Sequence, residues 1–345
     1  MSLHSEITEQ PVRIQSLLRA QKKTIERIAA EIGKRDIRYV FLAARGTSDN
    51  AGRYANYLLG AMNGLPLALA TPSLFTFYKK PPVLKNALVI GVSQSGKSPD
   101  IVSVLEEGRR QGCATLSITN EPKSPLARAS DFVIDIQAGR EKAVAATKTY
   151  TTELMSVAML SAALSGSQRH WEELDHLASW MKDVLKLDKF IEQAAQRYRY
   201  IEQTIVLGRG YNYATAFEWA LKLKELTYII AEPYSSADFA HGPIAMVESG
   251  YPIMAVAPKG KVFGSMLEML KRLRTEIAAE LVVISNDKKA LSLAQVPLPI
   301  PDDVPEWLSP LVSILPAQLF AYHLTVAKGY NTEQPRSIRK VTETK

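Results

Sequence analysis

The sequence contains one cysteine, Cys113, among 345 residues. A single cysteine cannot form an intramolecular disulfide, and no grouping of cysteine and histidine has the spacing of zinc ligands. These absences exclude disulfide-stapled secreted scaffolds and structural zinc modules. They favour a reducing compartment, and we expect a cytoplasmic protein.

Long hydrophobic runs are also scarce. The most apolar helical stretch is expected at residues 154–164, which is about 11 residues where roughly 20 are needed to cross a bilayer. The polar N-terminus, which includes His4 and Glu6, lacks the apolar core of a signal peptide. We therefore expect no membrane-spanning segment and no membrane partner.

The excess of charge of one sign is modest, since 42 basic and 35 acidic residues give a net charge of +7 with the histidines neutral. The basic residues are scattered and mixed with glutamate, as at 21–34, and they form neither an aromatic-interleaved stripe nor an arginine-rich tail. This pattern favours solvated faces with sites for small anions over a nucleic-acid surface. No nucleic-acid partner is expected.

The length allows about two compact domains at roughly 150 residues each. Short apolar runs end in Gly/Ser-rich turns and lead into segments with helical spacing. The runs are nearly continuous rather than alternating, which is typical of parallel strands covered on both faces. Strands are expected at 38–44, 87–92, 114–118 and 132–136, and then, after a helical connector at 171–199, at 204–207, 252–257 and 280–284.

The second set of strands repeats the first. Residues 38–50 correspond to 203–212, and residues 87–93 correspond to 251–257. The sequence therefore predicts an α/β protein with two doubly wound parallel-sheet domains in tandem. The expected boundaries are an N-terminal helical segment (1–30), a first domain (31–165), a helical connector (166–199), a second domain (200–330) and a C-terminal tail (331–345).

One loop of the first copy is rich in hydroxyl groups. The segment Ser93–Ser98 offers three serine hydroxyls, the amide of Gln94, and a close backbone approach at Gly96. A helix expected to begin near residues 99–100 would point free N–H groups at the same place. Because ligands bind beyond the carboxyl ends of parallel strands, we predict one phosphate site per chain at this loop. A polar turn capped by Ser98 is the alternative, but it explains one serine rather than three.

The same residues match the nucleotide-binding pattern G-x-x-x-x-G-K-S from Gly91 to Ser98, and Asp135 could be the acidic strand end that positions Mg²⁺. An ATPase is therefore a rival hypothesis. Against it, Gly91 falls within the apolar strand, so the turn is too short to wrap two phosphates, and Pro99 gives the rival no support. A dinucleotide site at residues 208–214 lacks the required glycine spacing.

In the second domain, a helix expected at 215–229 carries Glu218, Lys222 and Glu225 at i, i+4 and i+7 on one face. A ladder of surface ion pairs is the ordinary interpretation, but few positions of this helix are expected to be exposed. A carboxylate beside a lysine in a partly dry site could instead move protons.

The histidines and the tail lysine have distinct settings. His241 lies in a turn-rich segment and is expected to be accessible, so it is a candidate acid or base. His323 lies in an apolar helix and is expected to be a core histidine, whereas the sequence alone gives His4 no role. Lys340 lies in a polar tail that could be frayed, or that could present a lysine for Schiff-base formation with a sugar carbonyl.

Six segments carry a combined signal: Arg45–Ser48 (RGTS), Ser93–Ser98 (SQSGKS), Val144–Lys148 (VAATK), Glu218–Glu225 (EWALKLKE), His241–Pro243 (HGP), and Gln334–Arg336 (QPR) with Lys340. Together they resemble the tandem sugar-isomerase (SIS) domain proteins, in particular the isomerase half of the glutamine–fructose-6-phosphate aminotransferases. The resemblance runs along nearly the whole chain. It implies two flavodoxin-like SIS domains, no metal, no cofactor, and a homodimer with a shared active site.

The resemblance also implies a role for each segment. Glu225, helped by Lys222, moves the proton between C1 and C2 of the sugar, and His241 opens the sugar ring across a dimer interface. Lys340 engages the carbonyl of the open-chain ketose. The residues that hold the sugar phosphate or lie beside the sugar are Thr47, Ser48, Ser93, Gln94, Ser95, Ser98, Val144 and Ala146.

The chain departs from the aminotransferase pattern at several points. A glutaminase domain is not expected, because Met1-Ser2 leads directly into helix, so glutamine is not the expected ammonia source. Ala146 replaces a serine, Arg339 precedes Lys340 where a small residue is usual, and Asp238 is the acidic residue before the HGP turn.

The reaction expected first is therefore isomerisation with deamination, in which glucosamine 6-phosphate and water give fructose 6-phosphate and ammonia. A deglycase that splits a sugar-phosphate–amino-acid adduct, or a stand-alone isomerase-like aminotransferase, would use the same residues. A non-catalytic sugar-phosphate sensor belongs to another class, but it would not need Glu225 and His241 together. No DNA-binding helix-turn-helix is recognisable in the sequence.

Overall fold

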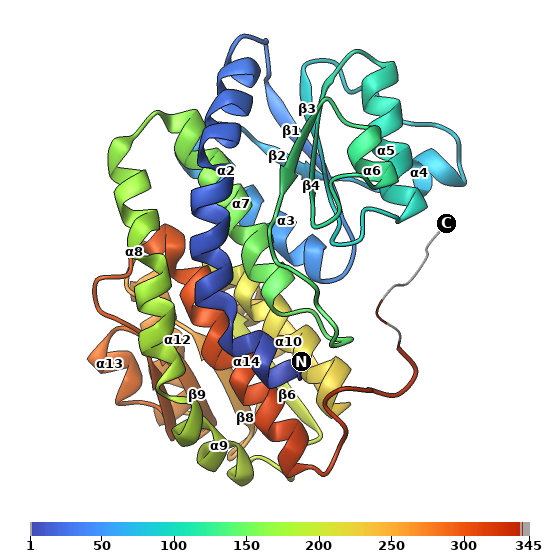
Figure 1. Ribbon diagram of the computed structural model, residues 1–345. Coiled ribbons are helices and arrows are strands. Elements are labelled where there is room, and N and C mark those ends of the chain that lie inside the picture. Colours follow the sequence, from blue (N-terminus) through green and yellow to red (C-terminus); the bar gives the residue numbers. More distant parts are fainter. Residues whose placement is uncertain (1, 339, 341–345) are drawn as a thin grey trace. The chain divides into compact units, whose positions relative to one another are not determined.

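The computed structural model of the chain describes residues 2–338 and 340 (Figure 1). The chain divides into two compact units, each built around one five-stranded sheet. The unit of the first sheet contains residues 12–141 and 148–175 with Lys340, and the unit of the second sheet contains residues 2–11, 142–147 and 176–338. Arg339 lies outside the described residues.

All strands of the first sheet are parallel, in the order β2-β1-β3-β4-β5. Their bounds are β1 (Tyr39–Ala43), β2 (Leu67–Leu69), β3 (Ala87–Val92), β4 (Ala114–Thr119) and β5 (Phe132–Asp135). The structure confirms the four strands expected from the sequence and adds β2, an edge strand too short to carry a recognisable pattern. Every residue of β3 and β4 is buried, which explains their continuous apolar runs.

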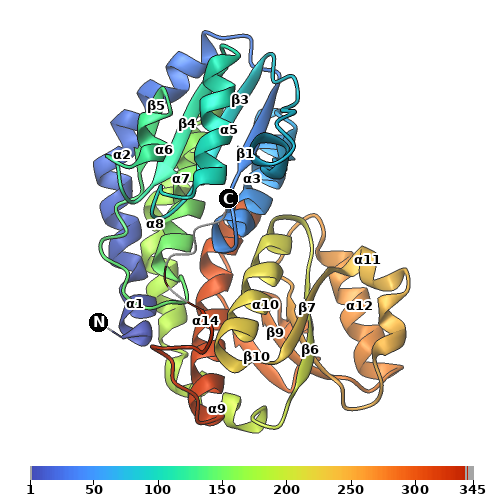
Figure 2. The same ribbon diagram turned by 90° about the vertical axis from the view of Figure 1, so that its right-hand side faces the viewer.

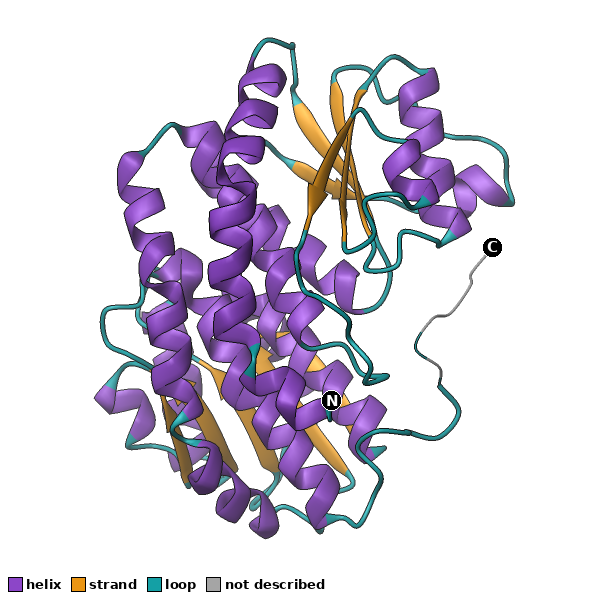
Figure 3. Ribbon diagram, viewed as in Figure 1, coloured by secondary structure: helices purple, strands orange, loops and turns teal. Residues whose placement is uncertain are grey.

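Helices cover both faces of the first sheet (Figure 3). One face packs in a core around Phe41, Val89 and Leu105, and the other face receives Gly52 against Leu42. The helices of the first face are α4 (Ser73–Thr76), α5 (Pro99–Arg110) and α6 (Pro125–Arg128), and those of the second face are α3 (Thr47–Asn63) and α7 (Lys148–Ser165). Two helices, α1 (Leu3–Thr8) and α2 (Gln10–Gly33), precede the first strand. Two others, α8 (Gln168–Leu185) and α9 (Asp188–Arg197), lie in the connector.

The second sheet is also fully parallel, in the order β10-β9-β8-β6-β7. Its strands are β6 (Gln203–Gly208), β7 (Ile230–Ser235), β8 (Pro252–Val256), β9 (Glu280–Ser285) and β10 (Val296–Pro299). The three expected strands are confirmed, and the two missed strands, β7 and β10, contain Pro233, Pro297 and Pro299. Both lie at the edges, which is where a sheet tolerates proline.

The two faces of the second sheet are covered by different helices (Figure 2). Phe239, Met266 and Ala290 belong to one core with the strands, and they place α11 (Ser236–Ala240), α12 (Phe263–Thr275) and α13 (Lys288–Leu291) on one face. On the other face α10 (Tyr213–Thr227) packs against β6 and against α14 (Ser309–Ala327), and α14 packs on α9. Short 3₁₀ turns are η1 (Gly210–Asn212), η2 (Pro243–Met246) and η3 (Glu306–Leu308).

The stretch at 154–164 is helical, as expected, but the inference from it that no helix is long and apolar enough to cross a membrane needs correction. That stretch belongs to α7, whereas the one helix of the described chain that is long and apolar enough to cross a membrane is the segment 306–327, which contains α14. Most of this segment is buried, as in the core helix of a domain. The apolar helix expected around His323 is part of α14, but its full length was not recognised, because a helix that is apolar on all sides has no periodic stripe to mark its extent.

The two sheets share one topology. In each, the first strand lies between the second and the third, so the order reverses beside the first strand. In the first sheet α3 and α5 follow the adjacent strands β1 and β3 and cover opposite faces. A reversal of this kind opens a crevice at the carboxyl ends of the strands, where open α/β sheets bind ligands.

Candidate functional site

The predicted phosphate loop lies at the carboxyl end of β3, between Val92 and the start of α5 at Pro99. Gly91 is buried within β3, so the sequence match to a nucleotide-binding loop does not correspond to a loop of that length. Ser98 occupies the N-cap position of α5, but its side chain makes no capping hydrogen bond. The ordinary explanation of Ser98 as a helix cap is therefore not supported.

Gly96 fixes the shape of this loop. Its φ of +59° is in the left-handed region, and a Cβ there would lie 2.1 Å from Oγ of Ser124. The loop is also held by backbone hydrogen bonds, from Asn120 N to Gln94 O at 3.1 Å and from Leu126 N to Gly96 O at 3.0 Å. The loop is thus built before any ligand arrives, which favours anion binding by backbone and hydroxyl donors.

A second loop, Arg45–Ser48, follows β1, and α3 begins at Thr47. The Arg45 guanidinium donates to the buried carboxylate of Asp100, at 2.8 Å, and so ties this loop to the first turn of α5. The Ser48 hydroxyl donates to Glu153 on α7 at 2.8 Å. Two helix N-termini and their hydroxyl groups are therefore held at neighbouring strand ends, where a phosphate dianion would be stabilised.

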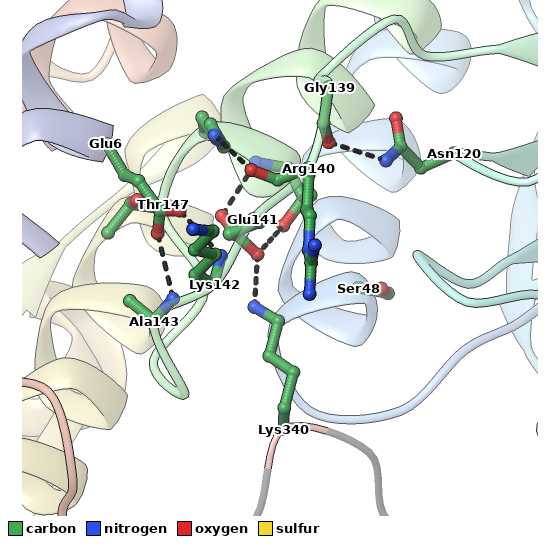
Figure 4. A network of polar contacts seen from close by, with 12 residues as sticks. Glu6, Ser48, Asn120, Gly139, Arg140, Glu141, Lys142, Ala143, Thr147 and Lys340 are labelled. Carbon is green, nitrogen blue, oxygen red and sulfur yellow. Dashed lines mark hydrogen bonds and ion pairs between the residues drawn. The ribbon is translucent and has the colours of Figure 1, made fainter. Parts of the chain in front are cut away.

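Lys340 belongs to the unit of the first sheet and forms an ion pair there with Glu141 (Figure 4). Its Nζ is 2.5 Å from Oε2 of Glu141, whose side chain is fully buried. Glu141 also accepts hydrogen bonds from the backbone N–H and the hydroxyl of Thr149, at 3.2 and 2.8 Å. Lys148, which the VAATK segment contributes, is buried and donates to the carbonyl of Arg140 at 2.8 Å.

The segment 142–147, which contains the predicted sugar-side residues Val144 and Ala146, belongs to the other unit. The carboxylate of Glu6 on α1 accepts from the backbone N–H groups of Lys142 and Ala143, at 2.6 and 3.1 Å (Figure 4). The amide of Gln318 on α14 donates weakly to the carbonyl of Thr147, at 3.4 Å. Helices far away in the sequence therefore fix the shape of this segment.

The C-terminal tail is ordered by specific contacts rather than frayed at residues 331–336. The carboxylate of Glu333 accepts from the N–H of Leu3, at 3.0 and 3.1 Å. The Arg336 guanidinium stacks 3.8 Å from the ring centroid of Tyr228, and the Arg336 N–H donates to the Tyr228 hydroxyl. A frayed end would have no such partners, so these contacts argue against fraying at residues 331–336.

The predicted acid–base residues lie on α10 and form a buried ionic network. The Lys222 ammonium lies 3.3 Å from Oε1 of Glu218 and 2.5 Å from Oε2 of Glu225. The side chains of Lys222 and Glu218 are 1% and 0% exposed, whereas that of Glu225 is 24% exposed. A ladder on a solvated face would be exposed throughout, so the ordinary interpretation of this spacing is wrong.

This network fixes the charge of Lys222. Burial alone would lower the pKa of Lys222, but the charges of Glu218 and Glu225 outweigh burial and raise the pKa above its ordinary value. Lys222 is therefore an ammonium cation, which can orient and stabilise a carboxylate but cannot accept a proton. Of the three groups, Glu225 is the carboxylate that solvent or a ligand can reach.

His241 is exposed, as expected, at the C-terminal end of α11. Because α11 covers the face of the second sheet opposite to α10, the fold separates His241 from the Lys222 network within this unit. No hydrogen bond or ion pair joins His241 to Glu225 among the residues that the structure describes. A joint role of the two residues would need a second copy of the chain.

Sequence reasoning missed four buried carboxylates around these groups, namely Glu6, Asp100, Glu141 and Glu153. Each accepts a hydrogen bond from a residue or segment that the sequence singled out, or from its immediate neighbour. In the sequence, Asp100 lies two residues after the SQSGKS segment and Glu141 three residues before the VAATK segment, so both could be seen to lie near a candidate segment. Their burial could not be predicted, because it depends on packing between distant elements.

The family model of the SIS domain matches residues 35–163 and 199–328. Over 318 residues the chain is 35% identical to an isomerizing glutamine–fructose-6-phosphate aminotransferase of Gloeobacter violaceus. That alignment covers 88% of this chain and 52% of the relative, so the chain spans about half the length of that relative.

Among solved structures, the C-terminal domain of glucosamine-fructose-6-phosphate aminotransferase from Francisella tularensis matches with a TM-score of 0.87 at 29% identity, over 96% of this chain and 98% of that one. Glucosamine-6-phosphate deaminase from Thermotoga maritima matches with a TM-score of 0.82 at 21% identity, over the whole of both chains. At 21% identity, the match to the Thermotoga maritima structure shows that the two chains share a fold.

The buried network on α10 predicts the stability of two variants. Lys222→Met leaves the buried Glu218 carboxylate without its cation and should lower the free energy of unfolding by about 3 kcal/mol or more, measured by urea denaturation. Adding Glu218→Gln should restore part of that loss. The control is Lys224→Met, at an exposed position of the same helix, which should change little. A Lys222→Met protein as stable as the control would show that the network is not charged as described.

Proposed function

The chain belongs to the SIS-domain family, and from that premise we propose that it is a sugar-phosphate isomerase acting on an amino-sugar 6-phosphate. The proposed reaction converts glucosamine 6-phosphate and water to fructose 6-phosphate and ammonia. The observation that carries this proposal is the buried Lys222 cation beside Glu225, because it supplies an accessible carboxylate base next to a fixed positive charge.

The reaction requires one proton transfer between adjacent carbons. In the open-chain aldehyde, Glu225 takes the proton from C2, which leaves an enolamine. Return of a proton to C1 gives the imine of fructose 6-phosphate at C2, and water hydrolyses that imine and releases ammonia. Lys222, whose ammonium lies 2.5 Å from Oε2 of Glu225, orients this carboxylate at the start of the sequence.

The phosphate group is assigned to the unit of the first sheet. Backbone N–H groups and hydroxyls at the starts of α3 and α5 suit an anion with three oxygens, and the carbonyls of Gln94 and Gly96 are already engaged in fixing the shape of the loop. The residues proposed to bind the phosphate are Thr47, Ser48, Ser93, Gln94, Ser95 and Ser98. Because the phosphate group is far from the reacting carbons C1 and C2, the free energy of binding it can hold those carbons in the orientation that the reaction needs.

Two assignments complete the proposal. Lys340, as an ammonium donor held by Glu141, is assigned to the oxygen of the open-chain carbonyl. His241 is assigned to ring opening in a homodimer, because α11 keeps it away from Glu225 within its own unit. Val144 and Ala146 are assigned to the sugar side of the substrate, on a segment held by Glu6.

The substrate proposal is tested by incubating the protein with glucosamine 6-phosphate and measuring ammonia and fructose 6-phosphate together. Equal amounts of the two products support it. Release of lysine from fructoselysine 6-phosphate, without ammonia from the amino sugar, would replace it by a deglycase. Tight binding of both compounds without turnover would replace it by a sugar-phosphate sensor.

Glu225→Gln should abolish proton exchange at the sugar carbon while the affinity for sugar phosphate stays nearly unchanged, because the amide cannot act as a base. We expect a loss of at least about 100-fold in deuterium incorporation into fructose 6-phosphate in D₂O, followed by NMR. Glu268→Gln, at an exposed position of α12, is the control. Full exchange in the Glu225→Gln protein would assign the base elsewhere.

Ser95→Ala should weaken the binding of fructose 6-phosphate by about 1–3 kcal/mol, the usual contribution of a hydrogen bond to a charged group. Isothermal titration calorimetry measures this change directly. Ser292→Ala, an exposed serine of the other unit, should leave the affinity unaltered. If both variants bind like the parent protein, the phosphate does not contact this hydroxyl.

A further inference from the structure

Two histidines and an aspartate, none of them a residue assigned above, converge in the unit of the second sheet. His4 comes from α1, Asp188 is the first residue of α9, and His323 lies on α14. Nε2 of His4 is 2.7 Å from Oδ2 of Asp188, and Nε2 of His323 is 2.6 Å from Oδ1 of the same carboxylate. The potential ligand atoms all lie within 4.8 Å of one another.

This geometry is close to that of a zinc ligand set. Zinc binds imidazole nitrogen and carboxylate oxygen at roughly 2.0–2.2 Å, so ligand atoms on a tetrahedral ion are about 3.3 Å apart. The observed N···O distances are 2.7 and 2.6 Å, those of hydrogen bonds, and need to open by about 0.6–0.7 Å to reach that separation. An ion between these groups would replace the protons that Nε2 of each ring shares with the carboxylate.

The surroundings also suit a cation that enters from solvent. The side chains of His4 and Asp188 are about one-third exposed, and that of His323 is 10% exposed. The His4 ring packs 5.1 Å from the ring of Tyr322.

We propose that His4, Asp188 and His323 form a Zn²⁺ site, with a water molecule as the fourth ligand. Two imidazoles and one carboxylate favour zinc over magnesium or calcium, which prefer oxygen ligands only. The sequence could not reveal the site by ligand spacing, because His4 and His323 are 184 and 135 positions away from Asp188. The proposal is independent of the reaction proposed above.

Binding at this site would have a structural consequence. The site joins α1 to α9 and α14, and α1 is also held by packing on α14 and by the hydrogen bonds from Leu3 to Glu333. The same short helix carries Glu6, which fixes the segment 142–147. Zinc would therefore stabilise the position of α1 and, through Glu6, the backbone of that segment.

The test uses the full chain without a histidine tag, freed of metal with EDTA and then titrated with ZnCl₂ alone by calorimetry. We expect one zinc ion per chain and a rise in the thermal unfolding midpoint on zinc addition. Asp188→Asn and His4→Gln should each weaken zinc binding at least about tenfold, as loss of a ligand does. His176→Gln, an exposed histidine on α8, is the matched control and should bind zinc like the parent protein.

The titration with CoCl₂ gives a second measurement, since Co²⁺ bound by nitrogen and oxygen ligands absorbs visible light and the bands should disappear in Asp188→Asn. Unfolding midpoints in EDTA establish that each variant is folded. If Asp188→Asn unfolds the protein, the zinc affinity of His4→Gln is the deciding measurement. His4 lies on the six-residue helix α1, where a substitution is expected to affect folding less. Absence of a stoichiometric zinc site in the parent protein, or equal zinc affinity in His4→Gln, would overturn the proposal and leave the cluster as an ion-pair contact only.

Discussion

The position of the first strand between the second and the third is the constraint on which the rest of each unit depends. In the first sheet this order sends α3 and α5 to opposite faces while their N-termini remain at adjacent strand ends. The positive ends of two helix dipoles are thereby placed at adjacent strand ends. The Arg45–Asp100 ion pair then holds the two loops together, so the proposed anion site would follow from the topology, with a few side chains to complete it.

The second sheet has the same order but does not build the same site. Ala257 and Pro258 stand where the first sheet has Ser93 and Gln94, so this loop lacks a hydroxyl at its start and one backbone N–H. The N–H of Lys259 donates to Asn286, which uses another donor of the loop internally. The two sheets therefore share one strand order but carry loops of different chemistry.

The sequence was sufficient where a signal is local. Continuous apolar runs predicted seven buried strands, and the spacing of Glu218, Lys222 and Glu225 predicted a polar face on a helix that packs into a core. It was insufficient for the edge strands β2, β7 and β10, which are short or contain proline and obtain their hydrogen bonds from a neighbour that the chain meets only after folding.

Long-range polar partners were invisible for the same reason. Glu141 meets Lys340, and Asp188 meets His4 and His323, across most of the chain. His323 shows the limit clearly. Its apolar helix predicts a core histidine, and its side chain is indeed buried, but the carboxylate beside it comes from a different helix.

Stability alone does not explain the ionic network of Lys222, Glu218 and Glu225 on α10. Placing an ammonium and two carboxylates in a core costs several kcal/mol of desolvation, and an apolar set of similar volume is often as stable or more stable. The fold alone therefore gives no reason to keep Lys222 between Glu218 and Glu225. A carboxylate that must be held in one orientation at the edge of an apolar core does give a reason, because the buried Lys222 ammonium binds it there. The one carboxylate of this network that remains accessible is Glu225, and its accessibility is what a purely structural ion pair would not require.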